Sequence, residues 1–186
     1  VTLEEPPKRV VVKLAGPDAE LACPFERTAR LHTLVTERTS IPMPEILGVD
    51  TSYAQYPWRY LVKTHIEGIE WVDAREQMDQ RELADAFGQI GRGVAELHAI
   101  RFPFFGELTV DGEVERDLGC FEAVRARVRE WIHPPVMQAR FLELLESRRG
   151  LFEGVSRASL CHEDLHQHNI LFERRADGWR LATILD

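Results

Sequence analysis

The sequence is poor in cysteine, and its few cysteines are not arranged in pairs. Cys23, Cys120 and Cys161 are the three cysteines among 186 residues. An odd number without Cys-x-x-Cys spacing argues against a disulfide framework and against the common zinc motifs. The cysteines therefore predict a protein of a reducing compartment, and we expect it to be cytoplasmic.

Long apolar runs and an excess of basic residues are also missing. The longest apolar run, Val10–Leu14, is interrupted by Lys13, whereas a membrane span needs about 18–20 residues. The sequence has 23 Lys and Arg residues and 31 Asp and Glu residues, which gives a formal net charge of −8. Since nucleic-acid affinity depends on Lys and Arg neutralising phosphates, we expect neither nucleic acid nor membrane as a partner. Oligomeric state is left open.

The two ends lack features of a complete chain. The sequence begins at Val1 instead of Met, and it stops at Asp186, directly after an apolar, strand-like run. The start shows no charged, apolar and small-residue pattern of a signal peptide. The length and the apolar content of 44% suit a globular protein of one domain or two small ones. We expect the sequence to be part of a longer protein.

The first third of the chain has the pattern of a small α+β unit. The β-branched run Val10–Leu14 predicts a short buried strand. A helix is predicted from about Pro24 to Glu37, with Glu26 in its first turn. Two further strands are predicted over residues 46–49 and 59–64.

The middle of the chain is predicted to be helical, and its end returns to strands. From Gln80, apolar residues recur every three or four positions over about 20 residues, which predicts a long amphipathic helix. The residues of this stripe are Leu83, Phe87, Ile90, Val94 and Leu97. Two shorter helices are predicted before Gly150, and an Asp-Gly turn signal between apolar runs predicts a hairpin over 169–185. We expect an N-terminal lobe at 1–67 and a helical C-terminal lobe at 68–186.

The stretch 161–172 concentrates acids, imidazoles and an amide before an apolar strand, and two chemical interpretations fit it. His162, Glu163 and His166 match H-E-x-x-H, in which a helix places both histidines against zinc and the Glu acts as base. His162, Asp164 and Asn169 match H-x-D-x-x-x-x-N, in which the Asp accepts a hydroxyl proton and the Asn holds Mg²⁺ during phosphoryl transfer.

The residues that follow favour phosphoryl transfer. The predicted hairpin occupies nearly all of the chain after His166, so no helix remains to supply a third zinc ligand. The order of loop, Asn169, hairpin and Asp186 instead returns a second acidic residue to the metal, as phosphoryl transfer requires. A zinc metallohydrolase, a nucleotide-binding pseudokinase and a solvated loop without chemistry remain as alternatives.

These motifs resemble those of the aminoglycoside phosphotransferase-like kinases, which include choline, fructosamine and homoserine-type small-molecule kinases. The resemblance rests on the 162–172 stretch, on Ile184-Leu185-Asp186 and on Val94–His98, and it covers most of the chain. It implies an α+β, protein-kinase-like, two-lobed fold. It also implies that ATP and Mg²⁺ are used to transfer the γ-phosphate to a hydroxyl of an aminoglycoside-, choline- or sugar-like molecule.

The resemblance assigns roles to residues at both ends of the chain. It makes Asp164 the catalytic base and Asn169 and Asp186 the Mg²⁺ ligands. Glu163 stands where the family usually has Gly. The Gly-rich phosphate loop is expected before the first strand, but the first glycine is Gly16. That loop would then lie upstream of this sequence or be absent. The helices that bind the acceptor would follow Asp186, outside this sequence.

The resemblance also predicts the nucleotide-binding residues. Lys13, on the first predicted strand, would contact the ATP phosphates, and Glu26 in the following helix would hold it. The stretch 61–68 is similar to the hinge that binds adenine. By this alignment, the carbonyl of Thr64 and the N–H of Ile66 would meet the adenine edge.

Overall fold

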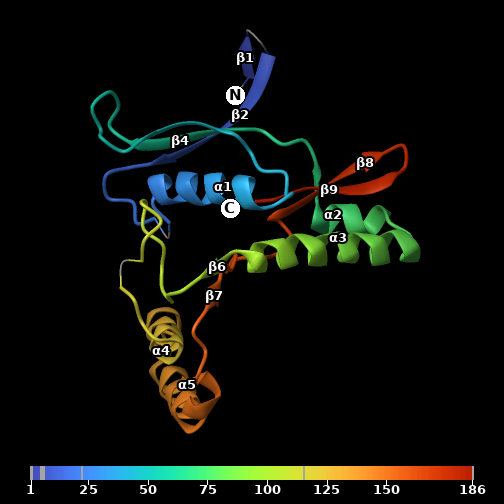
Figure 1. Cartoon of the computed structure of the whole chain (residues 1–186). Coiled ribbons are helices and arrows are strands. Elements are labelled where there is room, and N and C mark those ends of the chain that lie inside the picture. Colours follow the sequence, from blue (N-terminus) through green and yellow to red (C-terminus); the bar gives the residue numbers. More distant parts are fainter. Residues whose placement is uncertain (1, 5–6, 22, 115, 186) are drawn as a thin grey trace. The chain divides into compact units, whose positions relative to one another are not determined.

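The structure is a computed structural model that describes residues 2–4, 7–21, 23–114 and 116–185 (Figure 1). Contacts divide the chain into two compact units, one of Val1–Ala99 with Cys161–Asp186 and one of Ile100–Leu160. The boundary expected between residues 67 and 68 falls inside the first unit, and it stays a prediction.

A four-stranded antiparallel sheet begins the first unit, with strand order β1-β2-β4-β3. Its strands are β1 (Thr2–Glu4), β2 (Pro7–Ala15), β3 (Ile46–Asp50) and β4 (Arg59–Thr64). Helix α1 (Phe25–Arg38) contacts β3 and β4, and a small core of Ala15, Phe25 and Leu61 joins helix to sheet. The strands and the helix predicted in this region are confirmed.

A three-stranded sheet and the long helix complete the first unit. The sheet has the order β5-β8-β9, with strands β5 (Ile69–Glu70), β8 (Ile170–Arg175) and β9 (Gly178–Ile184). The helices are α2 (Trp71–Ala74), the 3-10 turn η1 (Arg75–Gln77) and α3 (Gln80–Ala99). The buried aromatic residues of the core between them are Trp71, Phe172 and Trp179. The predicted long helix and hairpin are confirmed.

Small and polar residues set how closely α3 approaches β9. A Cβ placed on Gly93 would lie 3.1 Å from Cδ1 of Ile184, so glycine permits the close contact. The Gln89 side chain is buried; its amide donates to the carbonyl of Trp179 and accepts from the N–H of Leu181, both at 2.8 Å. Gln89 therefore satisfies the outer edge of β9 as a further strand would.

The predicted apolar stripe of α3 is only partly the buried one. Phe87 is 61% exposed, although its ring contacts Trp71. The buried residues of the helix are Ala86, Gln89, Gly93 and Leu97. The close approach of β9 is accommodated by Gly93 and by the hydrogen-bonding Gln89, whereas the bulky Phe87 stays largely exposed.

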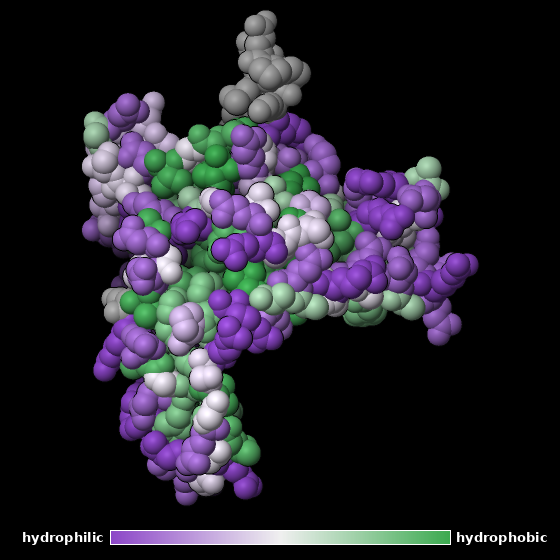
Figure 2. Space-filling view, in the orientation of Figure 1, coloured by the Kyte–Doolittle hydropathy of each residue, from purple (hydrophilic) through white to green (hydrophobic). Residues whose placement is uncertain are grey.

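The second unit contains two helices and a short two-stranded ladder. Its elements are β6 (Arg101–Phe102), α4 (Cys120–Trp131), α5 (Pro135–Ser147), the 3-10 turn η2 (Arg149–Phe152) and β7 (Ala158–Ser159). The guanidinium of Arg149 lies 4.0 Å from the ring centroid of Phe121 and ties η2 to α4. No residue of α5 is buried, and apolar surface is visible over α4 and α5 in Figure 2. The two helices predicted here are confirmed.

Within the part of the chain that the structure describes, no helix is both long enough and apolar enough to cross a membrane.

Candidate active site

The stretch between residues 161 and 169 is a loop of bends and turns that leads directly into β8. Short-range hydrogen bonds fold it back on itself: the N–H of Asp164 donates to the carbonyl of His162 at 2.8 Å, and the N–H of Asn169 to that of His166 at 3.0 Å. His162 and His166 therefore do not lie one turn apart on a helix. The conformation that an H-E-x-x-H zinc site needs is replaced by a loop.

Glu163 adopts a backbone conformation that normally favours glycine. Its φ angle is +62°, in the left-handed region where a Cβ is unfavourable. This is the position at which the resembling family usually has Gly. The loop thus keeps the glycine-type turn with a side chain in place, which turns the backbone between His162 and Asp164.

Asn169 holds Asp164 through two hydrogen bonds from one amide group. Its Nδ2 lies 3.0 Å from the Asp164 carbonyl and 3.2 Å from Asp164 Oδ2. Because Nδ2 is the donor in both hydrogen bonds, Oδ1 is the atom of this amide that could bind a cation, and an amide oxygen is a ligand suited to Mg²⁺. The structure therefore brings together the predicted base and one predicted metal ligand.

Two hydrogen bonds bring the end of β9 to the same loop. The Nε2 of His162 lies 2.7 Å from the carbonyl oxygen of Leu185, and the N–H of Leu185 donates to the carbonyl of Asn169 at 2.7 Å. Leu185 directly precedes Asp186, the other predicted metal ligand, which lies outside the described residues. The chemistry of the donor set, an amide oxygen and a carboxylate, fits a hard cation such as Mg²⁺.

A cavity of about 330 Å³ lies between α3 and the loop. Val94 and Leu97 of α3 line it together with Leu165, and its polar lining residues are His98, Cys161, His162 and Glu163. The loop thus has a mainly apolar hollow on its α3 side. Among the described residues, no three His, Cys, Asp or Glu side chains are grouped as metal ligands.

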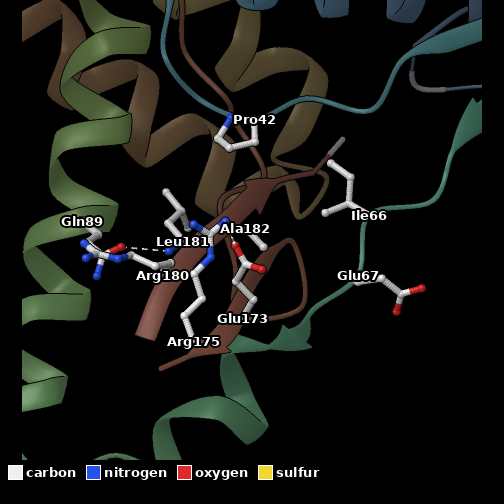
Figure 3. A pocket seen from close by; sticks show the side chains of 9 residues that line it. All are labelled: Pro42, Ile66, Glu67, Gln89, Glu173, Arg175, Arg180, Leu181 and Ala182. Carbon is white, nitrogen blue, oxygen red and sulfur yellow. Dashed lines mark hydrogen bonds and ion pairs between the residues drawn. The ribbon is translucent and has the colours of Figure 1, made fainter. Parts of the chain in front are cut away.

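A second hollow, of about 390 Å³, lies beside the predicted hinge (Figure 3). Ile66 contributes to it from the hinge, and Leu181 and Ala182 contribute from β9. Glu173 and Arg175 form an ion pair at its edge, while Glu67 points away in Figure 3. Ile66 therefore lies next to a hollow, whereas Thr64 belongs to β4 and accepts a hydrogen bond on its hydroxyl from the N–H of Glu45.

The predicted phosphate-binding pair lies on β2 and α1. Lys13 is half-buried on β2, opposite Leu61 of β4. Glu26 is in the first turn of α1, as predicted, and its carboxylate accepts a hydrogen bond from the hydroxyl of Thr51. Their roles toward a nucleotide stay predictions.

Glu96, in the 94–98 stretch, connects α3 to the segment that follows α1. Its carboxylate accepts hydrogen bonds from the N–H of Ser40 at 2.5 Å and from the Ser40 hydroxyl at 2.8 Å. These two donors lower the pKa of Glu96 below its usual value, because they favour the ionised form. Glu96 is therefore a structural tie.

The sequence pattern did not single out Glu70, which the structure places beside the loop. Glu70 ends β5, and its Oε2 lies 2.5 Å from Nδ1 of His168. Nothing local marks such a pair, since 98 positions separate the two residues. The contact results from the register between β5 and β8, which places Glu70 opposite Leu171.

The fold is protein-kinase-like. It has a small antiparallel sheet with one helix, then a short strand, and a long helix that packs against a loop and hairpin. The family comparison agrees: the model of the phosphotransferase enzyme family (APH) matches residues 1–186, and the chain belongs to that family. No curated protein matched the sequence.

Among solved structures, the chain is similar to a thermostable mutant of aminoglycoside phosphotransferase APH(4)-Ia in its apo form. The TM-score is 0.63 and the sequence identity is 14%, over 95% of this chain and 58% of that one. At this identity the likeness shows the fold. The chain spans 58% of the length of the structure it matches.

Proposed function

We propose that this member of the phosphotransferase family is an ATP-dependent kinase that phosphorylates a hydroxyl group of a small molecule. The observation that supports the proposal is the hydrogen-bonded pair of Asp164 and Asn169, in a loop that also binds Leu185 at the end of β9. Phosphoryl transfer depends mainly on positioning and on neutralising charge. In the proposal, Asp164 positions the acceptor hydroxyl, and Asn169 and the residue after Leu185 hold the cation that neutralises charge.

Asp164 acts as the base in this proposal. Its side chain is 71% exposed, so an acceptor hydroxyl has room to reach it. The carboxylate takes the hydroxyl proton as the acceptor oxygen bonds to the γ-phosphorus, and the bond from that phosphorus to the bridging oxygen of ADP breaks. Asn169 and Asp186 would hold Mg²⁺, which when bound neutralises charge on the phosphate oxygens.

The nucleotide is assigned to residues of β2, α1 and the predicted hinge in the same unit. In the proposal, Lys13 contacts the ATP phosphates and Glu26 keeps it in place. Thr64 and Ile66 offer main-chain groups to adenine. The hollow beside Ile66 and the exposed position of Asp164 support an arrangement with adenine at the hinge and the γ-phosphate at the loop.

The acceptor is proposed to be aminoglycoside-, choline- or sugar-like. The net charge of −8 suits a cationic acceptor of this kind. We further propose that neither nucleic acid nor membrane is a partner and that the protein works in the cytoplasm. The odd number of cysteines, without paired spacing, supports a reducing compartment.

The experiment is a titration of the purified protein with Mg²⁺–ATP by calorimetry, followed by a phosphate-transfer assay. Radiolabelled ATP would be offered with aminoglycosides, choline and hexoses, each acceptor in a separate reaction, and Asp164→Asn would be the paired control. We expect Mg²⁺-dependent ATP binding and labelling of one acceptor class. Stoichiometric zinc in a protein that does not bind ATP would refute the proposal.

A further inference from the structure

Three residues, Glu70, His168 and His166, form a set of contacts from β5 to the proposed base, in which the link from His168 to His166 is made by a backbone N–H. Glu70 Oε2 lies 2.5 Å from His168 Nδ1, the His168 N–H donates to His166 Nδ1 at 3.1 Å, and His166 Nε2 lies 3.6 Å from Asp164 Oδ2. The rings of His166 and His168 meet edge to face, with centroids 5.6 Å apart. His166 thus lies between an anchored residue and the carboxylate.

The contact with the backbone determines which nitrogen of His166 carries the proton. A backbone N–H only donates, so Nδ1 of His166 has to accept and is unprotonated. A neutral imidazole has one N–H, which is then on Nε2, the atom that faces Asp164. His166 is therefore held as a neutral donor directed at the carboxylate.

The two oxygens of Asp164 have different surroundings. Oδ2 has two N–H groups near it, Asn169 Nδ2 at 3.2 Å and His166 Nε2 at 3.6 Å. Oδ1 accepts no hydrogen bond from the residues that the structure describes. The distance from His166 is longer than a hydrogen bond, and catalytic contacts of this kind commonly tighten when substrates bind.

We infer that His166 is a positioning residue for Asp164: its Nε2–H and Asn169 hold Oδ2, so that Oδ1 is the oxygen that receives the acceptor's proton. This inference rests on the proposed kinase function. The Glu70–His168 pair anchors the ring from the β5 side. In the reaction, the hydroxyl proton passes to Oδ1, the acceptor oxygen bonds to the γ-phosphorus, and ADP leaves with the electrons of the broken bond.

Two substitutions of His166 separate this role from a purely structural one. His166→Gln places an amide N–H where Nε2 lies but loses the ring acceptor for the His168 N–H. His166→Asn places an oxygen near Nδ1 but has no donor that reaches Asp164. We expect Gln to keep kcat within about threefold and Asn to lower kcat about 10-fold or more, with KM for ATP unchanged, since general-base assistance is worth about 10²–10⁴-fold in all.

The opposite order, with Asn active and Gln impaired, would show that His166 only holds the loop and would overturn the inference. An equal loss of activity in both variants would do the same. The acceptor for these assays is the one labelled in the phosphate-transfer screen. If wild type transfers phosphate and the order is reversed, this inference fails alone; if wild type neither binds nor uses ATP, the proposed function fails first.

A second measurement needs no activity. In protein labelled with ¹⁵N at histidine, the ring nitrogens of His166, assigned by comparison with His166→Gln, report the tautomer directly. We expect a protonated Nε2 and an unprotonated Nδ1 in wild type at neutral pH. A proton on Nδ1 would contradict the inference whatever the kinetics show.

Discussion

The Nε2 atom of His162 lies 2.7 Å from the carbonyl oxygen of Leu185. The other ring nitrogen, Nδ1, accepts from the N–H of Asp164 at 3.3 Å, so the proton is on Nε2 and is donated to the carbonyl. The His162 ring thereby connects Asp164, the proposed base, with Leu185, which directly precedes Asp186.

The first prediction concerns this connection. His162→Ala should raise the concentration of Mg²⁺ needed for half-maximal ATP turnover by about 10–100-fold, the usual cost of losing a residue that orients a metal ligand. His162→Gln, which keeps an N–H near the position of Nε2, should raise this Mg²⁺ concentration less. Turnover measured against Mg²⁺ at saturating ATP tests this, and equal Mg²⁺ dependence in wild type and His162→Ala would contradict it.

The second prediction concerns Lys13 and Glu26. Lys13→Ala should lower kcat/KM for ATP far more than it lowers the unfolding temperature, because the ammonium is assigned to phosphate and not to the core. Glu26→Ala should lower turnover by releasing Lys13. Steady-state kinetics beside thermal unfolding separate the two effects. Unchanged kcat/KM in Lys13→Ala would mean that another residue contacts the phosphates.

Much of the fold was predictable because its signals are local. The Asp-Gly turn marked the hairpin, where Gly178 has a φ of +127° and the Asp177 carboxylate pairs with Arg180 at 2.6 Å. The lower pKa of Asp177 and the higher pKa of Arg180 both follow from this hydrogen bond. Strand and helix positions followed from periodicity in the same way.

Contacts between distant segments were not predictable from the same patterns. Hydrophobic periodicity weights large residues, so it placed Phe87 in the buried stripe, whereas the approach of β9 selects Gly93 and the hydrogen-bonding Gln89. The Glu70–His168 pair likewise depends on the register between β5 and β8. The motif could predict that Asp164 and Asn169 lie together, because all its members lie within one loop.

The third prediction concerns the left-handed residue Glu163. Glu163→Gly should be more stable than Glu163→Ala by about 1 kcal/mol, because a left-handed backbone costs an L-residue about 1–2 kcal/mol and glycine's greater unfolded-state entropy offsets part of that gain. Comparing these two variants removes the effect of losing the carboxylate, since both lack it. Urea unfolding provides the measurement, and an alanine variant as stable as the glycine variant would contradict the assignment of strain.

The fourth prediction is a pH dependence at Glu96. Ser40 lowers the pKa of this carboxyl in the folded state, so Glu96 adds stability above its unfolded value near 4.5 and loses it as the pH falls through the lower folded value. Glu96→Gln should therefore be less stable than wild type at pH 7, by about 1 kcal/mol given its partial exposure. The difference should shrink below about pH 4.5.

Ser40→Ala is the matched control for Glu96. It removes the hydroxyl donor and keeps the backbone N–H. At pH 7 it should therefore lower the free energy of unfolding less than Glu96→Gln does. Urea unfolding at a series of pH values measures both variants. A Glu96→Gln deficit that stays constant from pH 7 to pH 3 would show that the ionised carboxylate is not the stabilising form.

The last prediction is Asp164→Asn. The change preserves the size of the side chain but removes the carboxylate that would accept the hydroxyl proton, and such assistance is worth about 10²–10⁴-fold in rate. Binding of Mg²⁺–ATP should be nearly normal, because Lys13 and Asn169 are unchanged. We therefore expect phosphate transfer to be slower by at least about 100-fold at an unchanged calorimetric affinity for ATP.

Glu163→Gln is the control that distinguishes this assignment from the zinc interpretation, in which Glu163 is the base. Asp164 is hydrogen-bonded to Asn169 at 3.2 Å and is 71% exposed, whereas Glu163 occupies the strained turn beside it. The kinase assignment therefore predicts a modest effect of Glu163→Gln on kcat and a large effect of Asp164→Asn. If Glu163→Gln abolishes activity while Asp164→Asn retains it, the chemistry belongs to the neighbouring carboxylate, because the two substitutions remove the same charge one position apart.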